Sequence, residues 1–128
     1  MIWSGDLTLG IQHIDRQHER ICRFADLLQL ASRDRTVARL ALDFMFDHMA
    51  EHFVDEEDMM NTVNYPERLT HQRLHIQGFD RFVQLRAQFL AGKVSSEQIA
   101  ESFHGWVEDH ILREDRKLAD FVKGSPNV

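Results

Sequence analysis

The sequence predicts an all-α protein, in the form of an antiparallel up-down-up-down four-helix bundle with an extended N-terminal arm. Four long segments place apolar residues three or four positions apart, which is the spacing of a helix with one buried face. The breaks between these segments are short, and helices joined by short connections pack antiparallel to their neighbours. No segment alternates apolar and polar residues as a half-buried strand does. We therefore expect residues 1–128 to form a single domain.

The first helix is expected at about residues 15–32, with Asp15 as its N-cap, because a carboxylate accepts hydrogen bonds from the free amides of a first turn. Its apolar stripe comprises Ile21, Phe24, Ala25, Leu28 and Ala31. The dozen residues before it are expected to form an arm lying against the bundle. The apolar side chains of this arm are Trp3, Leu7, Leu9 and Ile11.

The second and third helices are expected at about residues 36–61 and 66–91. Pro66 disfavours helix at the residue before it and suits the first turn of the third helix, which Gly92 then terminates. The second stripe comprises Leu40, Phe44, Met45, Met49 and Phe53. The third comprises Leu69, Leu74, Phe79, Phe82, Val83, Leu85 and Phe89.

The fourth helix is expected at about residues 96–123, because Ser95 and Gln98 have the spacing of a capping box and Gly124 closes the segment. Its stripe comprises Ile99, Phe103, Trp106, Ile111, Leu112 and Leu118.

The composition limits the partners. With 15 basic and 21 acidic residues, the net charge is -6, and no block of like charges is present, so neither nucleic acid nor an anionic membrane is an expected partner. No apolar run approaches the length of a membrane span, and the first residues lack the pattern of a secretory leader. The single cysteine, Cys22, excludes an internal disulfide. We expect a cytoplasmic protein.

The chain carries eight histidines, and several have the spacing of metal ligands. Residues four apart lie about 40° apart around a helix, so they can reach the same point beside it. His52 with Glu56, and His71 with His75, have this spacing. His110 and Asp115 are five apart, about 140° around an α-helix, which is a poorer match.

His18 lies in the opening turn of the first helix, so that every helix supplies a candidate ligand. Imidazole and carboxylate ligands suit iron, manganese or zinc, and bridging carboxylates hold two metal ions close together in helical bundles. His48 precedes His52 by one turn and fits equally well by spacing. Spacing alone does not choose between them.

The sequence closely resembles the bacterial hemerythrins over nearly the whole chain. The resemblance is carried by Gly10-Ile11, Ile14-Asp15-Arg16-Gln17-His18, His52-Phe53-Val54-Asp55-Glu56-Glu57 with Met60, Tyr65-Pro66 before His71 and His75, and Trp106-Val107-Glu108-Asp109-His110-Ile111 with Asp115. The five-residue step from His110 to Asp115 is the spacing of that family. The family's second-helix ligand directly precedes phenylalanine, which favours His52 over His48.

The resemblance implies a cofactor of two iron ions, a di-iron centre with an oxo or hydroxo bridge. His71, His75 and His110 would bind one iron, and His18 and His52 the other, which keeps one open position. Glu56 and Asp115 would bridge the two. An oxygen pocket is expected to be lined by Met49, Phe53, Trp106, Ile111 and Leu112. His13 and His104 are interpreted as surface residues or as neighbours of the ligands, and His48 keeps open an alternative role or a role beside the ligands.

The function implied by the resemblance is reversible dioxygen binding by a carrier, store or delivery protein, and not an enzyme. A second hypothesis is an oxygen or redox sensor that acts through a partner protein. A third is a di-iron enzyme acting on peroxide, nitric oxide or ferrous iron. The sequence does not identify the oxygen-consuming or signalling protein that would be the partner.

Overall fold

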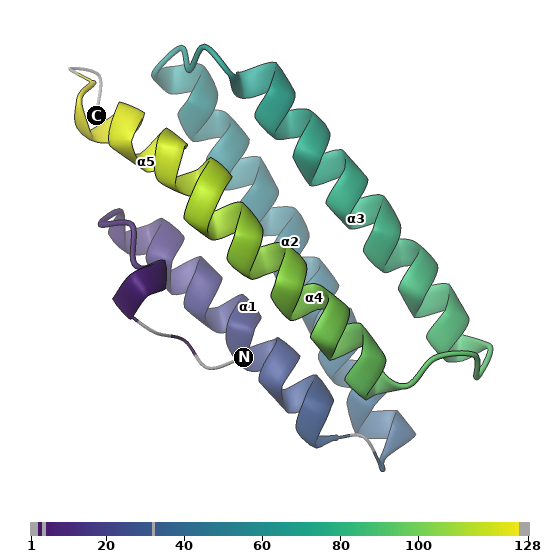
Figure 1. The fold of residues 1–128 in the computed structure, drawn as a ribbon. Coiled ribbons are helices and arrows are strands. Elements are labelled where there is room, and N and C mark those ends of the chain that lie inside the picture. Colours follow the sequence, from purple (N-terminus) through teal and green to yellow (C-terminus); the bar gives the residue numbers. More distant parts are fainter. Residues whose placement is uncertain (1–2, 4, 32, 126–128) are drawn as a thin grey trace.

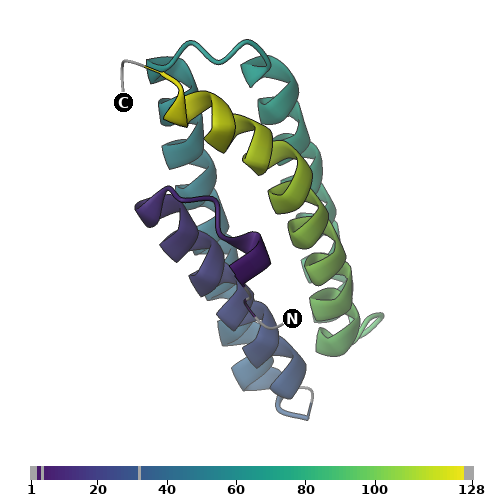
Figure 2. The same cartoon turned by 60° about the vertical axis from the view of Figure 1, so that its left-hand side comes forward.

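The computed structural model describes residues 3, 5–31 and 33–125, and these residues form an antiparallel four-helix bundle without a strand (Figure 1). The elements are η1 (Gly5–Leu7), α1 (Gln12–Leu30), α2 (Arg35–Thr62), α3 (Arg68–Leu90), α4 (Ser96–His110), η2 (Ile111–Asp115) and α5 (Arg116–Lys123). The helix α1 packs against α2 and α4, and α3 packs against the same two helices. Figure 2 shows the short arm before α1 lying on the outside of the bundle.

The first helix begins three residues earlier than expected, and Asp15 is not its N-cap. Ile11 occupies that position without a side-chain hydrogen bond. The Asp15 carboxylate instead accepts hydrogen bonds from the amides of Leu9, at 2.8 Å, and Gly10, at 3.0 Å. Asp15 therefore fastens the arm, in which Leu7 and Leu9 are buried as expected. This contact depends on a reversal of the chain at Gly10 (φ 87°), before the helix. The spacing of residues in the sequence does not reveal that reversal.

The connections to α2 and α3 also differ slightly from the expected boundaries. Asp34 is the N-cap of α2 and accepts hydrogen bonds from the amides of Thr36 and Val37. Pro66 lies with Glu67 in a turn before α3 and not in the first turn of that helix, and Asn64, in the left-handed region at φ 53°, lies in a separate turn that follows α2. Gly92 adopts φ 76° directly after α3, as expected for the residue that ends that helix.

The fourth helical stretch is interrupted by a π-helical segment. The capping box of Ser95 and Gln98 is present at its start. The continuous helix expected over residues 96–123 is instead α4, the π-helical η2 and α5 in succession. A π turn holds about one residue more than an α turn, so it brings residues five apart onto one face. The segment lies between His110 and Asp115, the pair whose spacing is irregular for an α-helix.

The core lies along the bundle axis, but the apolar stripes are wider than the face that is buried. Met45, Phe82, Ile99 and Phe103 are completely buried. Leu40, Phe44, Leu69, Val83 and Leu112 were expected on the buried stripes and are exposed. Their positions flank the core-facing side of each helix, where no second layer covers them. No helix in the described part of the chain is long and apolar enough to cross a membrane.

Candidate metal centre

All seven side chains expected as metal ligands meet in the interior of the bundle. They come from every helical stretch: His18 from α1, His52 and Glu56 from α2, His71 and His75 from α3, His110 from α4 and Asp115 from η2. Each is at most 6% exposed. Buried histidines and carboxylates are costly unless they are paired or hold a metal, so this grouping requires a physical reason.

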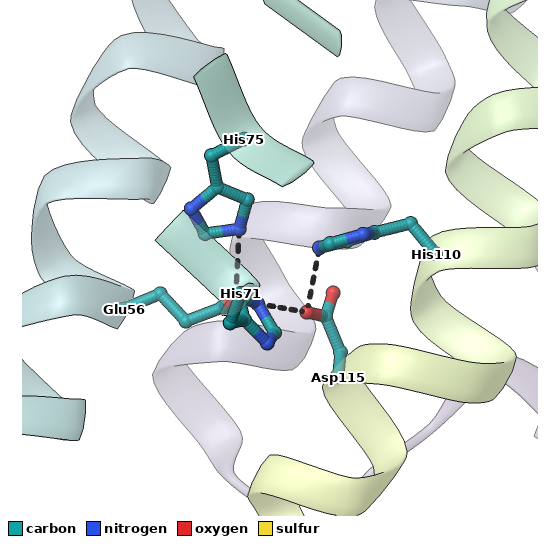
Figure 3. A group of neighbouring side chains, drawn as sticks. All are labelled: Glu56, His71, His75, His110 and Asp115. Atoms are coloured by element: carbon teal, nitrogen blue, oxygen red, sulfur yellow. Dashed lines mark hydrogen bonds and ion pairs between the residues drawn. The ribbon is translucent and has the colours of Figure 1, made fainter. Parts of the chain in front are cut away.

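The seven residues form two overlapping groups that share both carboxylates. The first group is Glu56, His71, His75, His110 and Asp115, drawn in Figure 3, and the second is His18, His52, Glu56 and Asp115. Within each group, one donor atom from every residue lies within 4.8 Å of the others. The bundle therefore contains two groups of side chains, with two residues in common, each of which could hold a cation.

Each carboxylate presents a different oxygen to each group. Glu56 Oε1 lies 3.1 Å from His75 Nε2, and Glu56 Oε2 lies 3.2 Å from His52 Nε2. Asp115 Oδ1 lies 3.0 Å from His110 Nε2, and Asp115 Oδ2 lies 3.1 Å from His18 Nε2. This is the arrangement in which a carboxylate bridges two cations, one on each oxygen.

Most of these donor atoms lack a hydrogen-bond partner, although they lie close together. Among the described residues, the buried side-chain atoms without one are His18 Nδ1, Glu56 Oε2, His71 Nδ1, His75 Nε2, His110 Nε2 and both oxygens of Asp115. A native core rarely leaves so many polar atoms unsatisfied. A cation in each group would satisfy the carboxylate oxygens and the Nε2 atoms together, so the donor set fits two metal ions.

The charges of the cluster suit metal binding. Burial and the charge of Asp115 would raise the pKa of Glu56, but His52 and His71 outweigh them and hold it well below its usual range. Burial would likewise raise the pKa of Asp115, and His110, His18 and His71 keep it low. Both carboxylates are therefore ionised at neutral pH, as metal ligands must be.

The pKa values of two histidines move in opposite directions. Burial lowers the pKa of His75, which keeps the imidazole neutral. Burial acts the same way on His71, but its contacts with Asp115 and Glu56 raise the pKa to about 10. A cation bound by His71 would therefore replace a proton, which couples metal binding to proton release.

Neighbouring polar groups orient two of the imidazoles. His52 Nδ1–H donates to Gln17 Oε1 at 2.8 Å, and Gln17 Nε2 donates to Asp55 Oδ2 at 2.6 Å. His75 Nδ1 lies 3.4 Å from Glu57 Oε2. Such contacts fix the ring so that Nε2 points at the metal. Gln17 was not foreseen as such a partner, although it lies directly before His18 in a motif that carries the resemblance.

Aromatic rings lie flat against two of the histidines, His75 and His110. The ring of Phe53 stacks on His75 with centroids 4.0 Å apart, and the indole of Trp106 stacks on His110 at 4.7 Å. Trp106 fits because α3 has Gly78 beside it, where a Cβ atom would overlap the indole. Gly78 was missed in the sequence. Its only signal was a glycine inside a helix, three residues after His75.

An apolar cavity of about 20 Å³ adjoins the cluster, which is room for roughly one small molecule. Met49, Phe53, Trp106 and Ile111 line it as expected. Leu112 does not: it follows Ile111 on the next position of the helix and is 38% exposed. The full lining is His18, Ile21, Met49, His52, Phe53, Phe103, Trp106, Val107, His110, Ile111 and Asp115.

The three remaining histidines lie outside both groups. His13 is exposed. His48 is half-buried, with Nδ1 at 3.0 Å from the carbonyl oxygen of Phe44. His104 Nε2 lies 3.6 Å from Asp26 Oδ1. The fold therefore brings His52, and not His48, to the cluster.

Comparison with known proteins gives a consistent result. The family model described as "Hemerythrin HHE cation binding domain" matches residues 9–122. A bacteriohemerythrin of Stenotrophomonas maltophilia (strain R551-3) is 33% identical over 129 residues, covering 99% of this chain and 84% of the relative. One of Pseudomonas aeruginosa (strain LESB58) is 29% identical over 127 residues, covering 98% and 83%. A crystal structure of a wild-type hemerythrin has a TM-score of 0.88 at 21% identity, covering 97% of this chain and 98% of that chain, which shows a common fold.

Proposed function

The chain belongs to the hemerythrin family, and from that premise we propose that it binds dioxygen reversibly at a non-haem di-iron centre, as an oxygen carrier, store or delivery protein. The observation that carries the proposal is the division of the two carboxylates, each with one oxygen in either histidine group. A single-ion site needs no such division. A pair of iron ions supplies the two electrons that dioxygen takes up on binding and recovers them on release.

His71, His75 and His110 would hold one iron and His18 and His52 the other, with Glu56 and Asp115 shared by both groups. The second group has one ligand fewer, and both of its histidines line the cavity, whereas of the three histidines in the first group only His110 does so. The group with fewer protein ligands thus faces the space in which a small molecule fits. This supports the assignment of the open position to the iron of His18 and His52.

The cavity walls favour binding over catalysis. Apart from ligand residues, the lining is apolar: Ile21, Met49, Phe53, Phe103, Trp106, Val107 and Ile111. None of these side chains offers a group that transfers a proton to a substrate. The same lining excludes water from the bound molecule, which favours its release unchanged.

The proposal is tested by replacing one histidine of an adjacent pair. Protein reconstituted anaerobically with ferrous iron is expected to hold about two irons per chain and to bind oxygen on exposure to air. His52→Ala should abolish oxygen binding, and His48→Ala, one turn away and outside both groups, should leave it intact. Zinc retained in preference to iron, one iron per chain, or loss of oxygen binding in His48→Ala alone would contradict the proposal.

A further inference from the structure

The outer face of α1 and α2 carries a contiguous apolar patch that none of the residues described by the structure covers. Leu27 of α1 and Leu40 and Phe44 of α2 are 42%, 54% and 52% exposed. Phe24 is half-buried beneath them and stacks on Phe44 with ring centroids 5.9 Å apart. We call Phe24, Leu27, Leu40 and Phe44 the α1–α2 patch. Single exposed apolar side chains are ordinary, whereas a continuous group of them marks an interaction surface.

Opposite charges lie side by side next to this patch. Towards the start of α1, the exposed side chains Arg16 and Arg20 follow the same helix face as Leu27. Towards the end of α2, the exposed Asp47 and Glu51 continue the face of Phe44. Among the residues that the structure describes, none of these four charges takes part in an ion pair.

The helices α1 and α2 run antiparallel (Figure 1), so the basic row, before Phe24 in α1, and the acidic row, after Phe44 in α2, lie at the same end of the patch. The Phe24–Phe44 contact fixes the relative height of the two helices. In antiparallel helices, residues equally far from this contact, before it in one helix and after it in the other, lie at the same height along the bundle. By this count, and to within one residue, Arg20 is level with Asp47 and Arg16 is level with Glu51. In the other direction Leu27 is level with Leu40.

This pattern is self-complementary. One possible two-fold axis lies in the plane of the patch and runs parallel to the helices. It would place α1 of each copy on α2 of the other copy and would keep both copies at the same height along the helix direction. Apolar residues would then meet apolar residues, and the arginines of each copy would meet the carboxylates of the other. A two-fold axis in the same plane but perpendicular to the helices would instead place the charged end of the patch of each copy on the apolar end of the patch of the other. We propose that a second copy of this chain docks on the α1–α2 patch and forms a two-fold symmetric dimer.

The size of the patch predicts a weak, reversible dimer. The eleven helical steps of α1 from Arg16 to Leu27 span about 17 Å, and two helices are about 20 Å wide, so the footprint is about 350 Å². Specific interfaces commonly bury about 800 Å² of accessible surface on each partner. The dimer should therefore depend on protein concentration, and salt should weaken it because exposed charges align it.

A contrasting surface on α3 provides a control. Leu69, Ile76, Val83 and Leu90 are also exposed and spaced seven residues apart. The exposed charges Arg73 and Asp80 lie singly along this row and do not form a basic row and an acidic row at one end of it. Substitution there changes an exposed apolar residue of a helix without touching the proposed interface.

The test is sedimentation velocity of the full chain from low micromolar to near-millimolar concentration. Wild type is expected to shift from monomer to dimer. Phe44→Glu should raise the dissociation constant about tenfold or more, since it buries a charge at the centre of the interface. Val83→Glu should leave the constant unchanged. Circular dichroism of both variants verifies that the helices remain folded.

Charge exchange makes the test specific for self-association. A variant with R16E and R20E, and another with D47R and E51R, should each be monomeric alone. Mixed in equal amounts, they should form a heterodimer. The glutamates introduced in the first variant would face the arginines introduced in the second, and the unchanged arginines of the second would face the unchanged carboxylates of the first. A wild type that stays monomeric at every concentration, a dimer equally disrupted by Val83→Glu, or charge variants that do not combine would overturn the proposal.

Discussion

At the scale of the residue, Gly78 decides where Trp106 lies. A Cβ atom at Gly78 overlaps the indole ring, which in turn stacks on His110. Gly78→Ala should therefore displace the indole and destabilise the fold by about 1–3 kcal/mol, the usual cost of overpacking. Gly105, on α4, has open space around its Cα, so Gly105→Ala should stabilise the protein by about 0.5–1 kcal/mol. Denaturant unfolding of both variants, with tryptophan fluorescence, checks the pair. Equal effects of the two changes would contradict the packing argument.

Cys22 gives a prediction about pH. Burial, reinforced by Asp26, raises the pKa of its thiol to about 12, so the folded protein keeps the proton after the unfolded chain has lost it. Stability is thus undiminished below the ordinary thiol pKa and falls as the pH rises from about 9 to about 12. The slope from this group is about 1.4 kcal/mol per pH unit. Across this range, the unfolding free energy of wild type should fall relative to that of Cys22→Ala by this amount for each pH unit. Parallel curves would rule out the contribution.

The sequence predicted which side chains meet in the cluster but not the groups that position them. His18, His52, His71, His75 and His110 were expected there from spacing together with the resemblance, because ligand types recur at fixed intervals along helices, and the fold brings them together. Gln17 and Gly78 were missed because each acts across a helix interface, on His52 and Trp106 respectively. Such partners follow from the packing of the bundle and leave no periodic signal in one chain.

At the scale of the element, the π-helical segment η2 determines which carboxylate reaches the cluster. In a regular α-helix Glu114, four residues after His110, would share its face, and Asp115 would turn away. The π turn shifts the face by one residue, so that Asp115 is buried and Glu114 is partly exposed.

Two adjacent substitutions test this element. Asp115→Ala should reduce the iron content below about two per chain, because one of the two bridging carboxylates is lost. Glu114→Ala should retain the full iron content and lose only a surface contact with Lys117, at 4.0 Å. Iron analysis after identical reconstitution measures both. Loss of iron in Glu114→Ala with retention in Asp115→Ala would show that the segment is α-helical in solution.

Helix boundaries were predictable where the signal is local. The capping box of Ser95 and Gln98 and the stop at Gly92 involve only neighbouring residues, and both predictions are confirmed. The N-cap role of Asp15 was wrong because its carboxylate binds the amides of the arm. The stripes also overestimated the core at Leu40 and Phe44, since periodicity shows which face is apolar and does not show what covers it.

At the scale of the whole molecule, the bundle has a core that does not depend on metal. Buried apolar residues extend along the bundle well beyond the seven ligands. Removing iron with a chelator should therefore leave the helical circular dichroism signal nearly unchanged. It should nevertheless lower the unfolding temperature, because a ligand that binds only the folded state stabilises that state. Unfolding of the chain on chelation at room temperature would contradict this expectation.

The central claim is that the di-iron centre binds oxygen and gives it back. The direct measurement is the oxygen taken up and released by the iron-loaded protein through repeated exposure to air and nitrogen, with peroxide assayed in solution. We expect about one dioxygen per pair of irons, recovered on each cycle with little loss. Trp106→Ala and Ile111→Ala should admit water, so that capacity declines within a few cycles while the iron content stays the same. Uptake that is not reversed under nitrogen, with a stoichiometric amount of hydrogen peroxide released by wild type, would contradict the carrier function and indicate an oxidase or a redox sensor.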